Sequence, residues 1–178
     1  TALAYADNHN VLMTLGINPT RPETAYGYIQ ANKGTPVSIK GNVAYTVKTF
    51  TEKPSQDLAK IFVESGEFLW NSGIFIWNLL AIKAELEQLQ PDISGLFQKG
   101  KGIYYTPDEE EFIKGVYEEC TSISVDYGIM EKTGKALVYP ASFGWSDLGT
   151  WESMYSHVDT DENGNIIRGG DTLVDKVN

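Results

Sequence analysis

The chain of 178 residues is long enough to form one domain with a closed hydrophobic core. Apolar residues make up 42% of it and aromatic residues 12%, which argues against disorder. Its formal charge of −10 argues against a general nucleic-acid-binding protein, because such proteins carry an excess of Lys and Arg that neutralises phosphates. Any anionic substrate must therefore meet local positive charge.

Cysteine content and hydropathy bear on the cellular compartment. The single cysteine, Cys120, excludes an internal disulfide, and no apolar run approaches the roughly 20 residues of a membrane span. The first residues carry no signal-peptide pattern. We therefore expect a cytoplasmic protein without a membrane partner. Because the chain begins with Thr1 rather than Met, we also expect it to be part of something longer.

The N-terminal segment predicts the end of a helix, a buried strand and a loop. Residues 1–10 resemble the tail of a helix followed by a turn. Residues 11–16 form a short apolar run that is typical of a central strand in a parallel sheet. Two prolines within residues 18–22 lack amide hydrogens and bias their predecessors away from helix, so this segment is a predicted loop.

A strand with a glycine in its middle is predicted next. Residues 24–30 favour a strand in which Gly27 lies between two tyrosines. One interpretation of Gly27 is a bulge between packed aromatic rings. Turn signals at residues 33–36 and 40–42 bracket a predicted hairpin, to which we assign no chemistry.

Residues 43–66 predict a strand, a turn and a helix. Apolar and polar residues alternate over residues 43–48 with the period of a half-buried strand. Pro54 ends that strand, and Ser55 can cap the next helix by accepting hydrogen bonds from its free amides. Gly66 supplies the C-terminal stop of this helix.

The following strand carries a polar interruption. Residues 68–77 are almost wholly apolar apart from Asn71, Ser72 and Gly73, so a second strand is predicted to enter the core. A buried amide requires hydrogen-bond partners, and Asn71 lacks local ones. Asn71 is therefore either a turn asparagine that bonds to its own backbone or a group that binds a ligand.

Helices dominate the region that follows. Asn78 can cap a core-facing helix that Pro91 closes. Residues 106–109 form a capping box for another helix. A helix that opens near Ser124 places Asp126 in its first turn, where the macrodipole favours a carboxylate with or without a ligand.

A lone carboxylate in an aromatic setting follows near the end of the chain. Asp147 lies between Trp145 and Trp151, with Gly149 nearby. An unpaired carboxylate in apolar surroundings is costly. We therefore expect Asp147 to be paired, protonated or bound to a metal.

Four motifs occur in order along residues 11–155. They are LGINPTRPETAYGYI at 15–29, EKP at 52–54 followed by WNSGIF at 70–75, SVDYGIMEK at 124–132, and FGWSDLGTW at 143–151. In this order they resemble the sugar-binding half of sugar-phosphate nucleotidyltransferases, and most closely the mannose-1-phosphate guanylyltransferase family. Ala25 is a departure, since that family usually has glycine at the matching position.

The resemblance implies an α/β fold with a mixed, mostly parallel sheet flanked by helices, forming the second half of a Rossmann-like nucleotidyltransferase domain. Residues 1–157 would be the C-terminal part of that domain, and residues 158–178 a connector towards a missing C-terminal region. Half a sheet would expose an apolar edge and face, so we expect a homo-oligomer.

The implied reaction joins a sugar 1-phosphate to the α-phosphate of a nucleoside triphosphate and expels pyrophosphate. In the closest family the substrates are mannose 1-phosphate and GTP, the product is GDP-mannose, and Mg²⁺ is the cofactor. The chain lacks the Gly-Gly-x-Gly-x-Arg loop that cradles the triphosphate in this family, so we expect it not to catalyse alone. Two alternatives stay open. One is an enzyme for another sugar, such as glucose 1-phosphate with dTTP or UTP, and the other is a catalytically inactive regulatory or sugar-sensing paralogue.

Carried onto the matching positions, the resemblance also names a substrate site. The residues that would contact the sugar phosphate are Gly27, Glu52, Lys53, Asn71 and Asp126. Lys53, stiffened by Pro54, would present one ammonium to a phosphate as a point charge. Asp147 would bind Mg²⁺, which offsets negative charge in the transition state. Lys53 and Asp147 are the candidate catalytic residues.

Overall fold

The computed structural model describes residues 1–149, 158–161 and 164–166. The chain divides into two units, Thr1–Ser142 and Phe143–Asn178. Every helix and strand of the described residues belongs to the first unit. The predicted connector at residues 158–178 lies largely outside the described residues, so a domain boundary at residue 157 stays a prediction.

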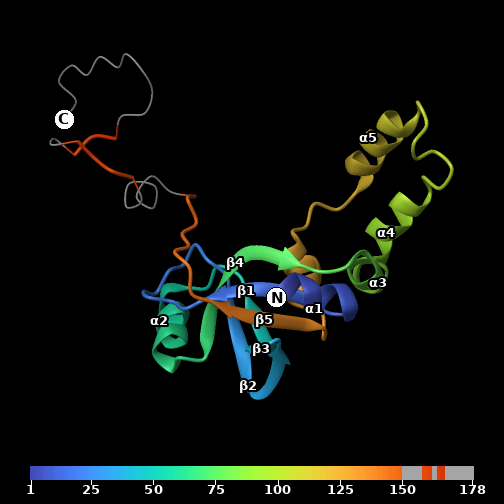
Figure 1. The fold of residues 1–178 in the computed structure, drawn as a ribbon. Coiled ribbons are helices and arrows are strands. Elements are labelled where there is room, and N and C mark those ends of the chain that lie inside the picture. The colour runs from blue at the N-terminus through green and yellow to red at the C-terminus, as the bar shows by residue number, and fades with distance from the viewer. Residues whose placement is uncertain (150–157, 162–163, 167–178) are drawn as a thin grey trace. The chain divides into compact units, whose positions relative to one another are not determined.

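The first unit combines five strands with helices on opposite sides of them, α2 on one side and α3 to α5 on the other (Figure 1). In chain order the elements are α1 (Ala2–Asn8), β1 (Leu12–Ile17), β2 (Tyr28–Ile39), β3 (Asn42–Thr51), α2 (Gln56–Ser65), β4 (Phe68–Ile76), α3 (Leu79–Leu89), α4 (Pro91–Gln98), α5 (Glu109–Glu119), the π-helix η1 (Asp126–Met130) and β5 (Ala136–Ala141). None of the helices described here has the length and apolar character needed to cross a bilayer.

The strands close into a ring in the order β1, β4, β2, β3, β5. Among the described strands only β1 and β5 pair in parallel, and the other four neighbouring pairs are antiparallel. The α/β class and the mixed sheet are confirmed, but the expectation of a mostly parallel sheet is wrong. One reason is the tight turn between β2 and β3, where φ is 47° at Lys40 and 82° at Gly41. A turn of two residues can join only antiparallel strands.

The expected exposed sheet edge is also wrong, because no strand of the described ring has a free edge. β5 pairs with β1 along its whole length and with β3 through Val138 and Leu137. It therefore occupies the position that an open half-sheet would leave unpaired.

β2 begins later and runs further than the sequence predicts. The predicted strand at 24–30 is a strand only from Tyr28 onward. The predicted turn at 33–36 lies inside β2, where the register against β3 shifts between Asn32 and Pro36. Pairing with β3 on both sides of this irregularity carries the strand through the glycine and the proline, so it prevails over the local turn signal.

The caps of α2 and α3 form at the predicted residues. The capping box predicted at residues 106–109 does not cap α5, because its N-cap residue is Asp108, which forms no side-chain cap hydrogen bond. Ser55 Oγ accepts a 3.4 Å hydrogen bond from the Leu58 amide, and Gly66 ends α2 with a φ of 67°. Asn78 Oδ1 accepts a 2.8 Å hydrogen bond from the Ala81 amide at the start of α3. The sequence patterns missed α4, in which Pro91 takes the first helical position.

Successive residues of β1 face two different apolar clusters. Leu12 packs in a cluster that includes Leu69 of β4. Met13 packs in a second cluster that includes Ala6 of α1. Because side chains of a strand alternate between its faces, Thr14 points to the same side as Leu12.

A buried ion pair joins α3 to the start of β5. Lys135 Nζ lies 2.7 Å from Oε1 of Glu85, which is buried. Burial raises the pKa of Glu85, but side-chain hydrogen bonds with Lys135 and Thr133 and the charge of Lys135 outweigh this effect, so the pKa is lowered overall.

Lys135→Met should lower the free energy of unfolding by about 3 kcal/mol at neutral pH, because it leaves the Glu85 carboxylate buried without its cation. The folded pKa of Glu85 lies below its ordinary value of 4.5, so the pair stabilises the fold above that pH. Its contribution is lost as the pH falls through the folded pKa, and the gap between the two proteins should then shrink. Denaturant titrations from about pH 7 to about pH 3 measure this.

Lys83→Met is the matched control, since Lys83 forms an exposed pair with Glu87 on the same helix at 3.9 Å. We expect it to cost less than about 0.5 kcal/mol. Equal losses in the two variants, or a gap that does not change with pH, would contradict the role given to the Glu85–Lys135 pair.

Candidate functional site

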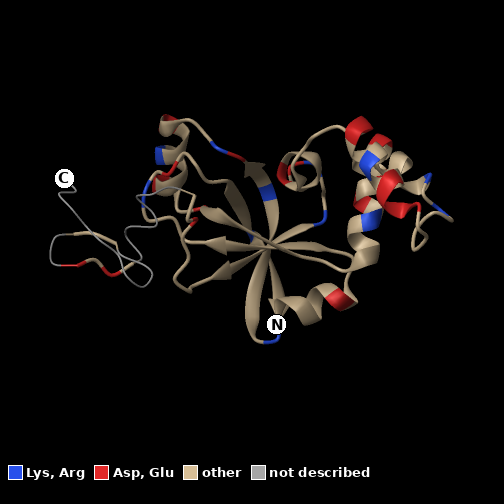
Figure 2. Ribbon diagram, turned by 90° about the horizontal axis from the view of Figure 1, so that it is seen from above, with Lys and Arg blue, Asp and Glu red and all other residues tan. Residues whose placement is uncertain are grey.

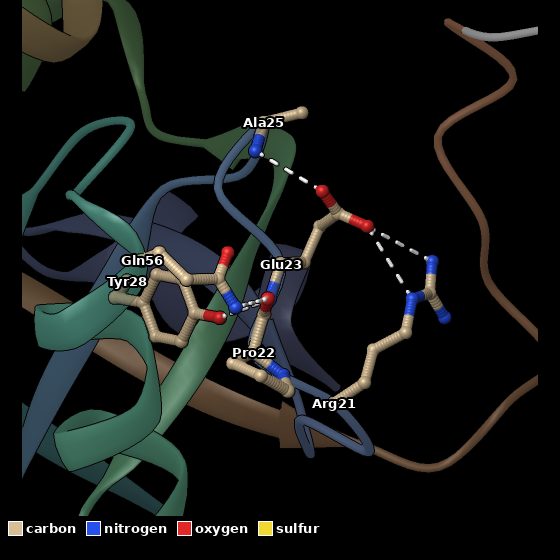
Figure 3. Close-up of polar contacts among 6 residues, drawn as sticks. All are labelled: Arg21, Pro22, Glu23, Ala25, Tyr28 and Gln56. Carbon is tan, nitrogen blue, oxygen red and sulfur yellow. Dashed lines mark hydrogen bonds and ion pairs between the residues drawn. The ribbon is translucent and has the colours of Figure 1, made fainter.

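Several bonds tie down the loop that leads into β2 (Figure 3). The Tyr28 hydroxyl accepts a 2.9 Å hydrogen bond from the Glu23 amide. The Glu23 carboxylate accepts a 3.2 Å hydrogen bond from the Ala25 amide and pairs with the Arg21 guanidinium at 3.3 Å. These bonds fix the backbone that positions Gly27 beside the strands.

Gly27 lies against two other predicted site residues. Its carbonyl oxygen accepts a 2.8 Å hydrogen bond from the backbone N–H of Asn71. A Cβ at Gly27 would contact Glu52 Oε2 and would lie 3.2 Å from Asn71 Cβ. A side chain here would therefore displace the Glu52 carboxylate, so the close approach requires glycine. Gly27 is not a bulge within a strand, because β2 begins at Tyr28.

Asn71 is at the centre of a buried hydrogen-bond network. Its Oδ1 accepts hydrogen bonds from the Thr14 hydroxyl at 3.1 Å and from the Gly73 amide at 3.2 Å. Its Nδ2 donates to Asp126 Oδ1 at 3.0 Å. Asn71 thus bonds to its own backbone turn, and one of its amide hydrogens has no partner among the described residues. That hydrogen can be donated to a ligand.

Thr14 is the member of this network that the sequence patterns missed. It is completely buried, and its hydroxyl bonds to a side chain on another strand. The only available signal was one hydroxyl in the otherwise apolar run of residues 11–16.

Asp126 lies in the first turn of η1, close to its expected place at a helix start. The helix is a π-helix, a form that is rare and frequent at functional sites. Besides accepting a hydrogen bond from Asn71, Asp126 contributes to raising the pKa of Lys53 through its charge. Asp126 therefore interacts with two of the other predicted site residues.

Glu52 and Lys53 form an ion pair beside Gly27. Glu52 Oε1 lies 3.0 Å from Lys53 Nζ, and the side chains are 12% and 63% exposed, respectively. The hydrogen bond with Glu52 and the charge of Glu52 raise the pKa of Lys53, with smaller contributions from Tyr127 and Asp126. The ammonium therefore stays charged at neutral pH and faces solvent, where it can meet an anion.

The backbone of Lys53 has an unusual conformation. Its φ of 48° lies in the left-handed region, which residues other than glycine rarely adopt. Its amide donates a 3.3 Å hydrogen bond to the carbonyl of Tyr26, the residue before Gly27. Backbone strain of this kind clusters at ligand sites, because the surrounding structure must hold it in place.

Asp147 belongs to the second unit and is not among the residues that the first unit brings together. A Cβ at Gly149 would lie 3.3 Å from both carboxylate oxygens of Asp147, so the glycine keeps that space open. Trp151, the second tryptophan of this motif, lies outside the described residues. In the part of the chain that the structure describes, no group of three or more His, Cys, Asp or Glu side chains is placed to hold a metal ion.

The negative charge of the chain is dense on one helix. Asp and Glu positions are coloured red along the ribbon in Figure 2, and the first turn of α5 holds three of these residues, Glu109, Glu110 and Glu111. Acidic side chains are favoured at that end of a helix by its dipole. An anionic ligand would depend on local cations such as Lys53.

Comparison with known proteins identifies the family. The family described as nucleotidyl transferase matches residues 1–164. The chain is 38% identical over 170 residues to a mannose-1-phosphate guanylyltransferase of Escherichia coli. The aligned region covers 95% of this chain and 36% of that protein. It is 40% identical over 168 residues to the mannose-1-phosphate guanylyltransferase RfbM of Salmonella typhimurium, with 93% and 33% covered. The chain spans about a third of the length of these curated relatives.

Solved structures share the fold. A crystal structure described as a mannose-1-phosphate geranyltransferase from Thermus thermophilus matches with a TM-score of 0.70 and 30% identity over 87% of this chain and 42% of that chain. The mannose-6-phosphate isomerase from Helicobacter pylori matches with a TM-score of 0.65 and 26% identity over 82% of this chain and 55% of that chain. The resemblance carried by the four motifs is therefore confirmed, and this chain belongs to the nucleotidyl transferase family.

Proposed function

We propose that the protein takes part in forming GDP-mannose and pyrophosphate from mannose 1-phosphate and GTP. The observation that supports this best is the convergence, within the first unit, of the residues Gly27, Glu52, Lys53, Asn71 and Asp126. The names of the relatives at 38% and 40% identity support the choice of mannose and guanine.

The chemistry of the site suits a sugar that carries a phosphate. Asn71 has an amide hydrogen to donate, and the Glu52 carboxylate offers acceptor oxygens, so both can bond to sugar hydroxyls. At Gly27 the absence of a side chain lets a ring approach the backbone. A hexose 1-phosphate has hydroxyls and a phosphate close together, as this site has acceptors and a cation close together.

Lys53 is the proposed phosphate-binding group. Its ammonium would exchange part of its interaction with Glu52 for the phosphate of the sugar. A phosphate oxygen of the sugar phosphate then attacks the α-phosphorus of the nucleotide. The new oxygen–phosphorus bond forms as the bond to the β-phosphate breaks, and pyrophosphate leaves without a covalent enzyme intermediate. In this scheme Lys53 orients the attacking phosphate.

We propose Mg²⁺ as the cofactor, with Asp147 as a ligand. A carboxylate is the ligand type that Mg²⁺ prefers, and the space beside Asp147 is kept open by Gly149. When bound, the ion would offset negative charge on the phosphates.

We also propose a cytoplasmic protein, since the only cysteine of the chain is free and requires no oxidising compartment.

Pyrophosphate release by the complete gene product tests the activity. With mannose 1-phosphate and Mg²⁺, we expect release with GTP to be fastest among the four common nucleoside triphosphates. Asp147→Ala should slow it by about 100-fold or more, while Asp92→Ala, an exposed aspartate on α4, should leave it unchanged. If the folded protein releases no pyrophosphate with any of the four triphosphates, the proposed activity is wrong. Faster release with another sugar phosphate or triphosphate would reassign the substrates.

Gly27→Ala should raise the KM for mannose 1-phosphate by about 10- to 100-fold, because its methyl group would displace Glu52 from the sugar side of the site. The KM for GTP should stay the same. Gly34→Ala in β2 is the control, since the new Cβ would have one close neighbour among the described residues, Asn32 Oδ1 at 3.4 Å. Equal KM values in Gly27→Ala and wild type would remove Gly27 from the sugar site.

We propose a homo-oligomer, although the exposed sheet edge first expected is absent from the described ring. Leu79 and Leu80 at the start of α3 are 76% and 78% exposed. Leu79 also lines a groove of about 830 Å³ in which apolar side chains of α3 and α4 lie among polar and charged ones. Light scattering should give at least twice the chain mass. Leu80→Glu should weaken association, and Leu58→Glu on α2 should not. A monodisperse wild-type monomer would contradict the proposal.

A further inference from the structure

β4 departs from regular pairing with β1 at the site. Thr14 pairs with Phe75, but Gly16 pairs with Asn71, so β4 contains two more residues than β1 over this interval. The extra length lies within Ser72, Gly73 and Ile74, which face Leu15 alone, and Gly73 has a φ of 71°. Bulges of this kind redirect side chains and are common beside active sites.

Thr14 lies at one end of this bulge, opposite Phe75, and its side chain bonds to Asn71 at the other end. Its hydroxyl is completely buried and must find a partner inside the protein. The partner is Oδ1 of Asn71, 57 positions further along the chain, at 3.1 Å. The Gly73 amide donates to the same oxygen from within the bulge. Two donors thus converge on one amide oxygen.

This convergence determines which way the Asn71 amide faces. In the opposite orientation Nδ2 would meet the Gly73 N–H, and two donors would point at each other. In the observed orientation Nδ2 faces Asp126 and retains a hydrogen for a ligand. The hydroxyl of Thr14 also fixes the oxygen in place, because it approaches from a different strand than Gly73 does.

We propose that Thr14 is a positioning residue that holds the side-chain amide of Asn71 in the orientation that binds the sugar of a hexose 1-phosphate. This role rests on the proposed function. Thr14 itself is completely buried and does not touch the substrate. Its effect on the reaction passes through Asn71 and, by way of the Asn71 Nδ2, through the position of Asp126.

Two substitutions separate the hydroxyl from the shape of the side chain. Thr14→Val keeps the shape and removes the hydroxyl, whereas Thr14→Ser keeps the hydroxyl and removes a buried methyl group. In Thr14→Val we expect the KM for mannose 1-phosphate to rise about 5-fold, with the KM for GTP unchanged. In Thr14→Ser we expect both KM values to stay within about 2-fold of wild type, with a lower Tm.

A double-mutant cycle tests whether the effect passes through Asn71. In an Asn71→Ala background, Thr14→Val should no longer change the KM for mannose 1-phosphate. An equal rise in both backgrounds would overturn the proposal. So would a Thr14→Ser variant whose KM rises as much as that of Thr14→Val.

A measurement without substrate keeps this inference separate from the proposed function. In ¹⁵N-labelled protein, the side-chain amide resonances of Asn71 should shift in Thr14→Val and stay close to wild type in Thr14→Ser. Unchanged resonances in Thr14→Val would overturn the positioning role even if the enzyme uses mannose 1-phosphate. If the resonances shift but wild type uses no sugar 1-phosphate, the proposed function fails, and the role in sugar binding fails with it, while the contact between Thr14 and the amide stands.

Discussion

A buried amide needs hydrogen-bond partners inside the protein, and the site depends on how those of Asn71 are arranged. Its oxygen accepts from Thr14 on β1 and from Gly73 in the bulge of β4, and its nitrogen donates to Asp126 of η1. The backbone of Asn71 also binds Gly27. One side chain and its peptide group therefore connect four segments that are distant in the chain.

A second constraint is that an acidic chain must present a cation to an anionic ligand. The pairing with Glu52 raises the pKa of Lys53 and so keeps the lysine charged. Its exposure has the same effect, because an exposed ammonium avoids most of the cost of desolvation. The Glu52 carboxylate beside Lys53 repels anions but accepts hydrogen bonds from hydroxyl groups. The two adjacent residues thus favour a ligand in which a phosphate and hydroxyls are neighbours, and a simple anion such as inorganic phosphate would satisfy only Lys53.

Local signals predicted the caps of α2 and α3 but not the way the strands pair. Ser55, Gly66 and Asn78 were identified because a cap depends on atoms within four residues of it. The ring of strands was not, because closure by β5 depends on residues more than a hundred positions from β1. Thr14 was missed for the same reason: only the folded ring brings its hydroxyl to Asn71. The site residues named from motifs did not require that knowledge, since each was carried over by resemblance.

The division of the chain into two units also divides the proposed chemistry. All the residues that would bind the sugar phosphate belong to the first unit, whereas Asp147 belongs to the second. The first unit supplies all three protein partners of the Asn71 side chain, so its sugar side is organised without Asp147. Under the proposed mechanism, defects in the first unit would weaken use of the sugar phosphate, and defects at Asp147 would slow transfer. The two groups of residues can therefore be separated by kinetics, because binding and transfer enter KM and kcat differently.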